Sequence, residues 1–353
     1  MKIALVLSAN IWSAPYISIY TKILKQYNVD YDIINWNRDL SEYKSEMSWN
    51  VAPKGGKFSK FWEYFRFSRF VKNRLLKDTY DRIVIFGPVM PIYLQRFLKV
   101  NFENKYLIDI RDLGIEQLPL FKNIYAKAVK YSALNSVSSP GFIEYLPKAD
   151  YLISHNFDIE QVANSLKRKT DCVLNKEIVE VLTIGQIRNF ESNIQIVDSL
   201  KNDSRFHLSF RGGGDVQSRI ISYVKDNSIN NVDFSGRYSK CDELNLIEKS
   251  TFVNIFMPPI KSHSSLMSNR FYNAVLMRKP MIVASSSVQG DFVEKYNLGI
   301  VVRDCSHLKT KILSFLDTLD FDDYCNKCND LLKKFVDDYN VFEKRFVEFI
   351  TDK

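Results

Sequence analysis

The chain has 353 residues, of which 46% are hydrophobic and 25% are charged, and its formal net charge is +8. This length suits two domains of about 150 residues each better than a single core. The composition is that of a soluble globular protein, and no apolar run approaches the roughly 18 to 20 residues that a membrane-spanning helix needs. An odd number of cysteines, five, gives no disulfide framework.

The first predicted element is a strand over residues 2–8. Its apolar run ends at Leu7, and Asn10, Trp12 and Pro15 follow. An apolar run this short is more typical of a buried first strand than of a signal peptide. We therefore expect a cytoplasmic protein.

Apolar runs alternate with helix-period stretches through the first half of the chain. Strands are predicted over 2–8, 29–35, 82–87, 105–110, 134–138 and 150–154, and helices over 16–27, 58–77, 89–99, 119–131 and 140–147. This alternation indicates a parallel, doubly wound sheet. The polar stretch 164–177 is interpreted as an interdomain linker.

A second series of the same kind follows the linker. Strands are predicted near 178–184, 206–211, 231–235, 251–256, 280–284 and 299–302, with helices near 191–201, 215–226, 241–249, 268–277, 289–295 and 306–318. The predicted fold is α/β, with two Rossmann-like doubly wound domains, 1–165 and 175–335, facing each other across a cleft. The tail from about 320 is amphipathic and helical, and its end, 336–353, is predicted to pack back on the first domain.

Ligands of open α/β sheets bind beyond the carboxyl ends of the strands, so the residues just after each strand are the candidates for a site. The loop after the first strand holds Asn10, Trp12 and Tyr16. It lacks the GxGxxG pattern that a dinucleotide pyrophosphate requires, so NAD and FAD are not expected here. Aromatic faces of this type can stack on sugars or lipid head groups, or simply pack the loop.

Two further strand ends in the first half carry charged side chains. Asp109 and Asp112 bracket Arg111, so one carboxylate can pair with the guanidinium while the other acts as a base or hydrogen-bond acceptor. The alternative is a structural ion-pair cluster. His155 follows the strand at 150–154, where it can contact a substrate or cap the loop.

In the second half, successive strand ends suggest an anion site. Gly185 allows close approach of a ligand, and Arg188 can form a bidentate pair with a phosphate. Arg211 and the three glycines after it precede a helix and leave backbone N–H groups open to a ligand. Asn269 and Arg270 begin the helix at 268–277, where the helix dipole favours an anion. Together these predict a phosphorylated ligand.

The ordered segments TIGQIRNFESNIQIVDSL, FRGGG, VDFSGRYS and SNRFYNAVLMRKPMIV resemble the donor-binding half of a GT-B glycosyltransferase. The resemblance is closest to the family-4 type used in bacterial surface polysaccharide assembly, such as capsule. LIDIRD and VSSPGFIEYL in the first half are similar to segments of the same enzymes, so the resemblance covers nearly the whole chain.

The resemblance implies a nucleotide-sugar donor on the C-terminal domain, with cations in place of a metal ion and no cofactor. The residues assigned to the donor are Gly185, Arg188, Arg211, Gly212, Gly213, Asn269, Arg270, Tyr272 and Asn273. A lipid-linked or oligosaccharide acceptor is expected on the N-terminal domain. Its assigned residues are Asn10, Trp12, Tyr16, Arg111 and His155, with Asp112 as the catalytic residue that polarises the acceptor hydroxyl.

One departure from the family pattern affects the expected chemistry. The family-4 pattern has two glutamates eight positions apart, which hold hydroxyls of the donor sugar and the ribose. Ser265 and Asn273 occupy these positions here. The retaining outcome therefore does not carry over, and two alternatives stay open: a catalytically silent GT-B scaffold that recruits a partner transferase to the membrane, and a related nucleotide-sugar enzyme such as an epimerase.

Residues 54–77 hold eight basic residues and a single acid, Glu63. A basic helix with aromatic residues can lie on an anionic membrane surface, on the inner face of the cell membrane. The residues assigned to this contact are Lys57, Lys60, Phe61, Trp62, Phe65, Arg66 and Arg69. The alternative is a crossover helix with its aromatic side chains in the core. Nucleic-acid binding is not expected, because the charge is confined to one helix and no recognised module is present.

Overall fold

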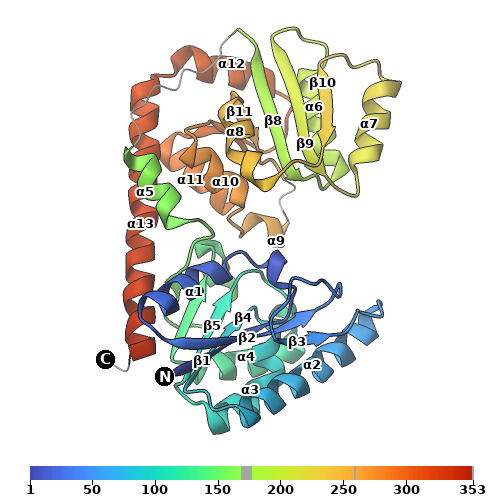
Figure 1. The fold of residues 1–353 in the computed structure, drawn as a ribbon. Helices are drawn as coiled ribbons and strands as arrows, with labels where there is room; N and C mark the ends of the chain where they lie inside the picture. Colours follow the sequence, from blue (N-terminus) through green and yellow to red (C-terminus); the bar gives the residue numbers. More distant parts are fainter. Residues whose placement is uncertain (168–176, 258–259, 352–353) are drawn as a thin grey trace. The chain divides into compact units, whose positions relative to one another are not determined.

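The computed structural model describes residues 1–167, 177–257 and 260–351. The chain divides into two compact units (Figure 1): unit 1 comprises Met1–His155 with Asp337–Lys353, and unit 2 comprises Asn156–Val336. Each unit is a parallel sheet wrapped by helices. In the described ranges, no helix is both long and apolar enough to cross a membrane.

The sheet of unit 1 has seven strands in the order β3-β2-β1-β4-β5-β6-β7. Its strands are β1 (Lys2–Leu7), β2 (Asp30–Asn37), β3 (Met47–Asn50), β4 (Arg82–Phe86), β5 (Tyr106–Ile110), β6 (Leu134–Val137) and β7 (Leu152–Ile153). The apolar runs of β1, β4 and β5 are almost wholly buried, as expected for central strands covered on both faces.

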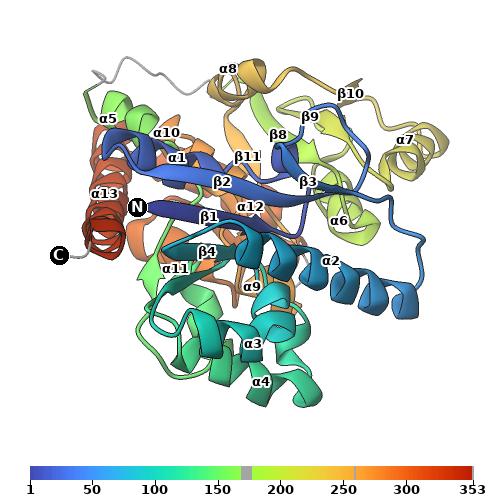
Figure 2. The ribbon, with the colours of Figure 1, turned by 60° about the horizontal axis from the view of Figure 1, so that its bottom comes forward.

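Helices cover both faces of this sheet (Figure 2). On one face lie α1 (Ile17–Gln26) and the end of α13 (Phe321–Thr351); on the other lie α2 (Lys57–Lys77), α3 (Val89–Asn101) and α4 (Pro119–Lys130). The ring of Tyr20 meets those of Phe86, Phe342 and Phe346 edge-on, with centroids 5.1, 5.4 and 5.1 Å away. The C-terminal residues thus complete the core of unit 1.

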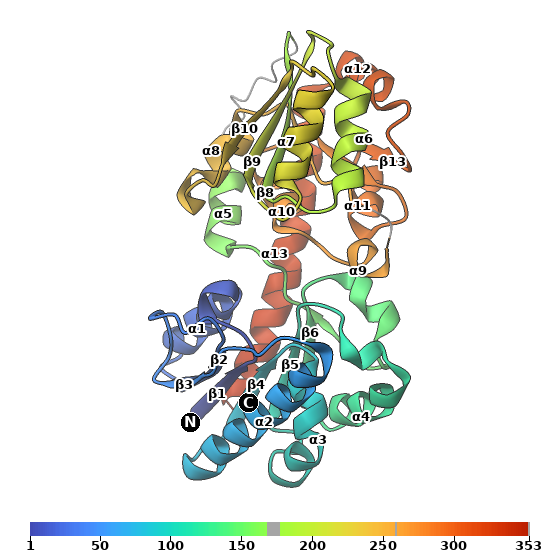
Figure 3. The same ribbon diagram turned by 90° about the vertical axis from the view of Figure 1, so that its right-hand side faces the viewer.

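Unit 2 has six strands in the order β10-β9-β8-β11-β12-β13. They are β8 (Val179–Gln186), β9 (Phe206–Gly213), β10 (Val232–Gly236), β11 (Phe252–Asn254), β12 (Met281–Ala284) and β13 (Gly299–Val302). One face packs against α6 (Phe190–Leu200), α7 (Gln217–Asp226) and α12 (Leu308–Thr318). The other packs against α5 (Ile159–Lys167), α8 (Glu243–Glu248), α10 (Asn269–Leu276), α11 (Val288–Tyr296) and the start of α13; Figure 3 shows the two layers around β8 and β9.

Helix α5, most of which was predicted to belong to the first domain, is part of unit 2. Its Val162 is buried in the core there, and the hydroxyl of Ser165 donates to the carbonyl of Leu276 at 2.9 Å. The buried guanidinium of Arg278 donates in turn to the carbonyl of Ser165 at 2.7 Å and to Asn329 Oδ1 at 2.9 Å. These polar contacts attach α5 to α10 and α13. Residues 168–176 of the predicted linker lie outside the described residues.

Most predicted elements match the structure to within a few residues. The sequence pattern missed β3, a four-residue edge strand too short to show alternation, and it missed the helices α5 and α9 (Lys261–Ser264). The residues predicted as a helix over 140–147 form a 3-10 helix, Pro140–Tyr145. The CxxC pair, Cys325 and Cys328, is buried in the core of unit 2. Burial raises the pKa of the Cys328 thiol to about 12, which leaves little reactive thiolate.

The contribution of the C-terminal residues to unit 1 can be measured with Phe346→Ala. This ring is fully buried, so its loss should lower the free energy of unfolding by about 3–5 kcal/mol. The control is Val341→Ala on the same helix, because Val341 is 57% exposed and should change stability little. Equal urea-unfolding midpoints for the two variants would contradict this packing.

Candidate functional site

A cavity lined by both polar and apolar residues opens in unit 2 at the carboxyl ends of β8 and β11, beside the start of α10. Its volume is about 380 Å³. An adjoining cavity of about 550 Å³ is lined by the ends of β8 and β9 and by the loop after β10. Gly185, Gln186 and Tyr238 line both cavities, so the two adjoin, and together they are called the groove. Its position is where ligands of open parallel sheets bind.

Two arginines face this groove without acidic partners. Arg270 sits in the first turn of α10, whose N-cap Ser268 accepts the N–H of Phe271 at 3.4 Å. Its guanidinium donates only to backbone carbonyls, Gln186 at 3.0 Å and Asn254 at 3.5 Å. Arg188 donates to the side chain of Gln186. Within the described part of the chain, neither arginine forms an ion pair with a carboxylate.

The electrostatics of Arg270 follow from this arrangement. Desolvation lowers the pKa of Arg270, and the positive charge of Arg188 lowers it further, while Tyr238 and the carboxylate of Glu243 raise it. Two cations that repel each other, with Glu243 as the one carboxylate among the residues that line their cavity, leave a net positive charge that favours an anionic ligand. Arg188, Arg270 and the exposed Asn269 all line this cavity, and their predicted role in donor binding stays a prediction.

Glycine is favoured at the ends of β8 and β9 for two different structural reasons. Gly185 has φ +90°, and a Cβ there would point toward Tyr238 and Arg270 across the groove. A Cβ on Gly212 or Gly214 would lie 1.9 Å from the carbonyl oxygens of Gly185 and Ile187 respectively. Backbone contact between the strand ends therefore requires glycine at these two positions, a reason that the sequence pattern did not indicate. Gly213 has no such contact, and all three glycines line the groove.

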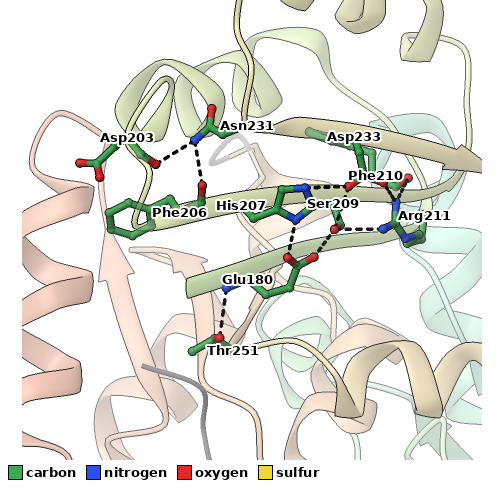
Figure 4. Close-up of polar contacts among 10 residues, drawn as sticks. All are labelled: Glu180, Asp203, Phe206, His207, Ser209, Phe210, Arg211, Asn231, Asp233 and Thr251. Atoms are coloured by element: carbon green, nitrogen blue, oxygen red, sulfur yellow. Dashed lines mark hydrogen bonds and ion pairs between the residues drawn. The ribbon is translucent and has the colours of Figure 1, made fainter. Parts of the chain in front are cut away.

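Arg211 was assigned to the donor site, but its side chain forms an ion pair with Asp233 instead. Its Nη1 contacts Asp233 Oδ2 at 2.5 Å and its Nη2 donates to Ser209 Oγ at 3.2 Å. The same sheet face carries His207, whose Nδ1 is 2.6 Å from Glu180 Oε2 (Figure 4). Strand alternation places residues 207, 209 and 211 on one face. Arg211 thus belongs to a surface network and does not line the groove.

Tyr272 and Asn273 also differ from the prediction. Tyr272 is 2% exposed, and its ring packs against those of Phe157 and Phe335, with centroids 5.9 and 5.3 Å away, so it is a core residue. Asn273 donates through Nδ2 to Glu243 Oε1 at 2.6 Å. The helical period places the side chain of Tyr272 in the core and directs that of Asn273 toward α8.

Several groove residues were not found from the sequence. They are Gln186, Arg237, Tyr238, Lys240, Glu243, Asn254, Phe256 and His263. Arg237 and Tyr238 follow β10 directly, so the strand-end rule contained a usable signal for them. Glu243 begins α8 and shows no local pattern, because its role depends on contacts with other elements.

In unit 1, the cluster around Arg111 is the structural ion pair that was left open as an alternative. Arg111 Nη2 lies 2.6 Å from Asp109 Oδ2, both side chains are buried, and Nη1 donates to the carbonyl of Ser154 at 2.9 Å. Desolvation raises the pKa of Asp109, although Arg111 opposes that shift. The guanidinium also stacks on Tyr16, 4.6 Å from the ring centroid. Asp112, by contrast, is exposed.

Other residues predicted to bind the acceptor organise the surface loops of unit 1. Asn10 Oδ1 accepts the backbone N–H of Arg38 at 2.7 Å. Trp12 donates its indole N–H to Asp39 Oδ2 at 2.8 Å and remains 59% exposed, so a fixed aromatic face is available for stacking. His155 is buried, with Nε2 3.0 Å from Asp338 Oδ2, and it anchors α13.

Helix α2 exposes its aromatic side chains. Phe61, Trp62 and Phe65 are 46, 61 and 39% exposed, while the buried seam consists of Glu63, Phe67, Ser68, Val71 and Leu75. The alternative in which these aromatics form the core is therefore wrong for these three residues. Lys60, Arg66 and Arg69 are exposed beside them. The side chain of Lys57 lies outside the described residues.

No metal centre is evident in the described ranges, where no three His, Cys, Asp or Glu side chains gather in a way that could hold an ion.

The groove geometry can be tested with neighbouring glycines. Gly214→Ala should destabilise unit 2 by about 3 kcal/mol, the upper end for overpacking, because its Cβ would clash with a carbonyl oxygen. Gly213→Ala should leave the unfolding temperature nearly unchanged, since its nearest neighbour is a side-chain oxygen at 3.6 Å. Thermal unfolding compares them, and equal losses would refute the contact between the strand ends.

No protein-family model and no curated protein matches the chain. In structure it is similar to sucrose-phosphate synthase from Thermosynechococcus elongatus, with TM-score 0.71 and 13% identity over 100% of both chains. It is also similar to HepE of Anabaena, solved in complex with UDP, with TM-score 0.67 and 12% identity over 100% of both chains. A third similar structure is alpha,alpha-trehalose 6-phosphate synthase from Burkholderia multivorans, with TM-score 0.68 and 9% identity over 99% of this chain and 98% of that one. These likenesses confirm the expected fold, an α/β chain with parallel sheets of seven and six strands as in GT-B glycosyltransferases.

Proposed function

We propose that this protein is a glycosyltransferase that moves a sugar from a nucleotide-sugar donor to a glycan acceptor. The observation that carries the proposal is the pair of arginines that line one cavity, Arg188 after β8 and Arg270 in the first turn of α10, neither of which forms an ion pair within the described residues. A nucleotide diphosphate supplies the missing negative charge. The fold shared with sugar synthases, and with HepE in complex with UDP, supports this choice of ligand.

The proposed chemistry follows from where charge develops. When the bond between the sugar and the diphosphate breaks, negative charge grows on the leaving phosphate. Arg188, Arg270 and the N-terminus of α10 would stabilise that charge more than the charge of the bound donor, which lowers the barrier. We propose that these cations act in place of a divalent metal ion.

Acceptor binding is proposed for unit 1. Trp12 would stack on a sugar ring, and Asp112 is the candidate for polarising the acceptor hydroxyl, since it is exposed and its charge acts on Tyr16. A lipid-linked glycan of bacterial surface polysaccharide synthesis is the proposed acceptor. The exposed aromatic and basic side chains of α2 support this choice, because they suit an anionic membrane surface.

A silent scaffold is the second candidate. It is favoured by Ser265 and Asn273, because neither position offers a carboxylate to the donor. Release of nucleoside diphosphate from any nucleotide sugar by the isolated chain would exclude this candidate.

Arg270→Ala separates ligand binding from folding. Loss of a charged contact should weaken UDP or GDP binding by roughly 100-fold. The free energy of unfolding should change little, because removal of a desolvated cation repelled by Arg188 offsets the loss of its hydrogen bonds to the carbonyls of Gln186 and Asn254. Calorimetric titration and urea unfolding measure the two effects.

The matched control is Arg211→Ala, which removes a cation of the surface network and should leave nucleotide affinity unchanged. Equal loss of affinity in both variants would overturn the assignment of Arg270 to the donor.

Membrane contact predicts binding to vesicles that contain phosphatidylglycerol, with little binding to neutral vesicles. Each basic residue near the surface contributes about 1 kcal/mol, and added salt should weaken the binding. The variant Trp62→Ser with Phe65→Ser should reduce co-sedimentation. Leu76→Ser, which changes an exposed apolar residue at the other end of α2, is the control. Binding that is equal on neutral and anionic vesicles would contradict the proposal.

A further inference from the structure

A carboxylate lies in the wall of the donor groove, where the family pattern does not place one. Glu243, the first residue of α8, is 7% exposed and lines the same cavity as Arg188 and Arg270. Burial of a carboxylate is costly unless donors surround it. Here three side chains donate hydrogen bonds to the carboxylate of Glu243, and these bonds stabilise its buried position in the wall of the groove.

The three donors fix the carboxylate in orientation. Oε2 accepts the hydroxyl of Tyr238 and the ammonium of Lys240, each at 2.7 Å. Oε1 accepts Nδ2 of Asn273 at 2.6 Å. A carboxylate can accept about four hydrogen bonds, so Oε1 retains capacity for a donor from the groove. Lys240 is 74% exposed at its side chain and contributes little as a salt-bridge partner.

The groove therefore has two chemically different parts. Arg188 and Arg270 suit the diphosphate, while the remaining acceptor capacity of Glu243 Oε1 suits a ligand group that donates a hydrogen bond. Tyr238 lines both cavities of the groove and bonds directly to Glu243, so the carboxylate lies near their junction. In a nucleoside diphosphate, the donors next to the phosphates are the vicinal hydroxyls of the ribose.

We propose that Glu243, held by Asn273 and Tyr238, accepts hydrogen bonds from the ribose hydroxyls of the donor and selects ribonucleotides over deoxyribonucleotides. This inference rests on the proposed function, because it requires a nucleoside diphosphate in the groove. The carboxylate that binds the ribose is therefore assigned to Glu243 on α8. Asn273, which stands on α10 where the family pattern has a glutamate, contributes an uncharged amide that holds this carboxylate.

The first experiment compares UDP with 2′-deoxy-UDP, and GDP with 2′-deoxy-GDP, by calorimetric titration. The unaltered protein should bind the preferred ribonucleotide about 10- to 100-fold more tightly than its deoxy form, because a hydrogen bond to a charged group is lost. Glu243→Gln should remove most of this preference. Asp242→Asn, which neutralises the neighbouring exposed carboxylate, should retain it.

The second experiment transfers the charge to the neighbouring helix. In Glu243→Gln combined with Asn273→Glu, the carboxylate returns to the same contact, and ribonucleotide preference should recover to within about threefold of the original, a small change in free energy. Asn273→Glu alone places two carboxylates in contact and should lower the unfolding temperature. The double variant keeps the test decisive even if a single variant folds poorly.

The outcomes separate this inference from the proposed function. Binding of UDP or GDP with no preference over the deoxy form, or a preference that survives Glu243→Gln, overturns the role of Glu243 and leaves the proposed function standing. Absence of binding to any of the four nucleotides overturns both. Loss of affinity only for nucleotide sugars in Glu243→Gln would reassign the carboxylate to the donor sugar and so overturn the ribose contact.

Discussion

The groove of unit 2 depends on one steric constraint, the backbone contact between the ends of β8 and β9. Gly212 and Gly214 bring their chain against the carbonyl oxygens of Gly185 and Ile187, a distance that no Cβ permits. Because the strands stay in register to their last residues, the loop that carries Arg188 emerges beside the loop after β10. Backbone packing between the strand ends thus sets the positions of the loops that line the groove, and the side chains on those loops supply its polar groups.

Electrostatics then decides which ligand suits that shape. Arg270 reaches back from α10 to the carbonyl of Gln186, and Arg188 lies close enough to lower its pKa. Two cations that contact carbonyl groups and form no ion pair within the described residues favour an anion in the groove. Glu243 adds one negative charge within the same cavity, which offsets the charge of Arg270 in part, and three side chains donate hydrogen bonds to it. Such a division of charge matches a ligand with phosphates at one point and hydroxyls beside it.

In unit 1, charged residues at a strand end stabilise the fold instead of lining a groove. Arg111 and Asp109 stand at a strand end, as Arg188 does, yet they are buried and satisfied by each other and by Ser154. Breaking such a buried pair leaves an uncompensated charge, so this cluster supports the loop more than it binds a ligand. The residues predicted to bind the acceptor differ in exposure. Trp12 and Asp112 lie at the surface, whereas His155 is buried and contacts Asp338 of α13.

The sequence by itself determined the alternation of strands and helices and the two parallel sheets, apart from the edge strand β3 and the helices α5 and α9, and it placed Arg188 just after a strand and Arg270 at the start of a helix. Periodicity is local, and parallel strands place all their carboxyl ends at one edge, so these features need no knowledge of distant contacts. Only the tertiary structure decided that Arg211 turns to Asp233 on the next strand, that Tyr272 enters the core and that Glu243 meets Asn273 from another helix. The direction and partners of a side chain depend on residues far away in the chain, and the local pattern carries no information about them.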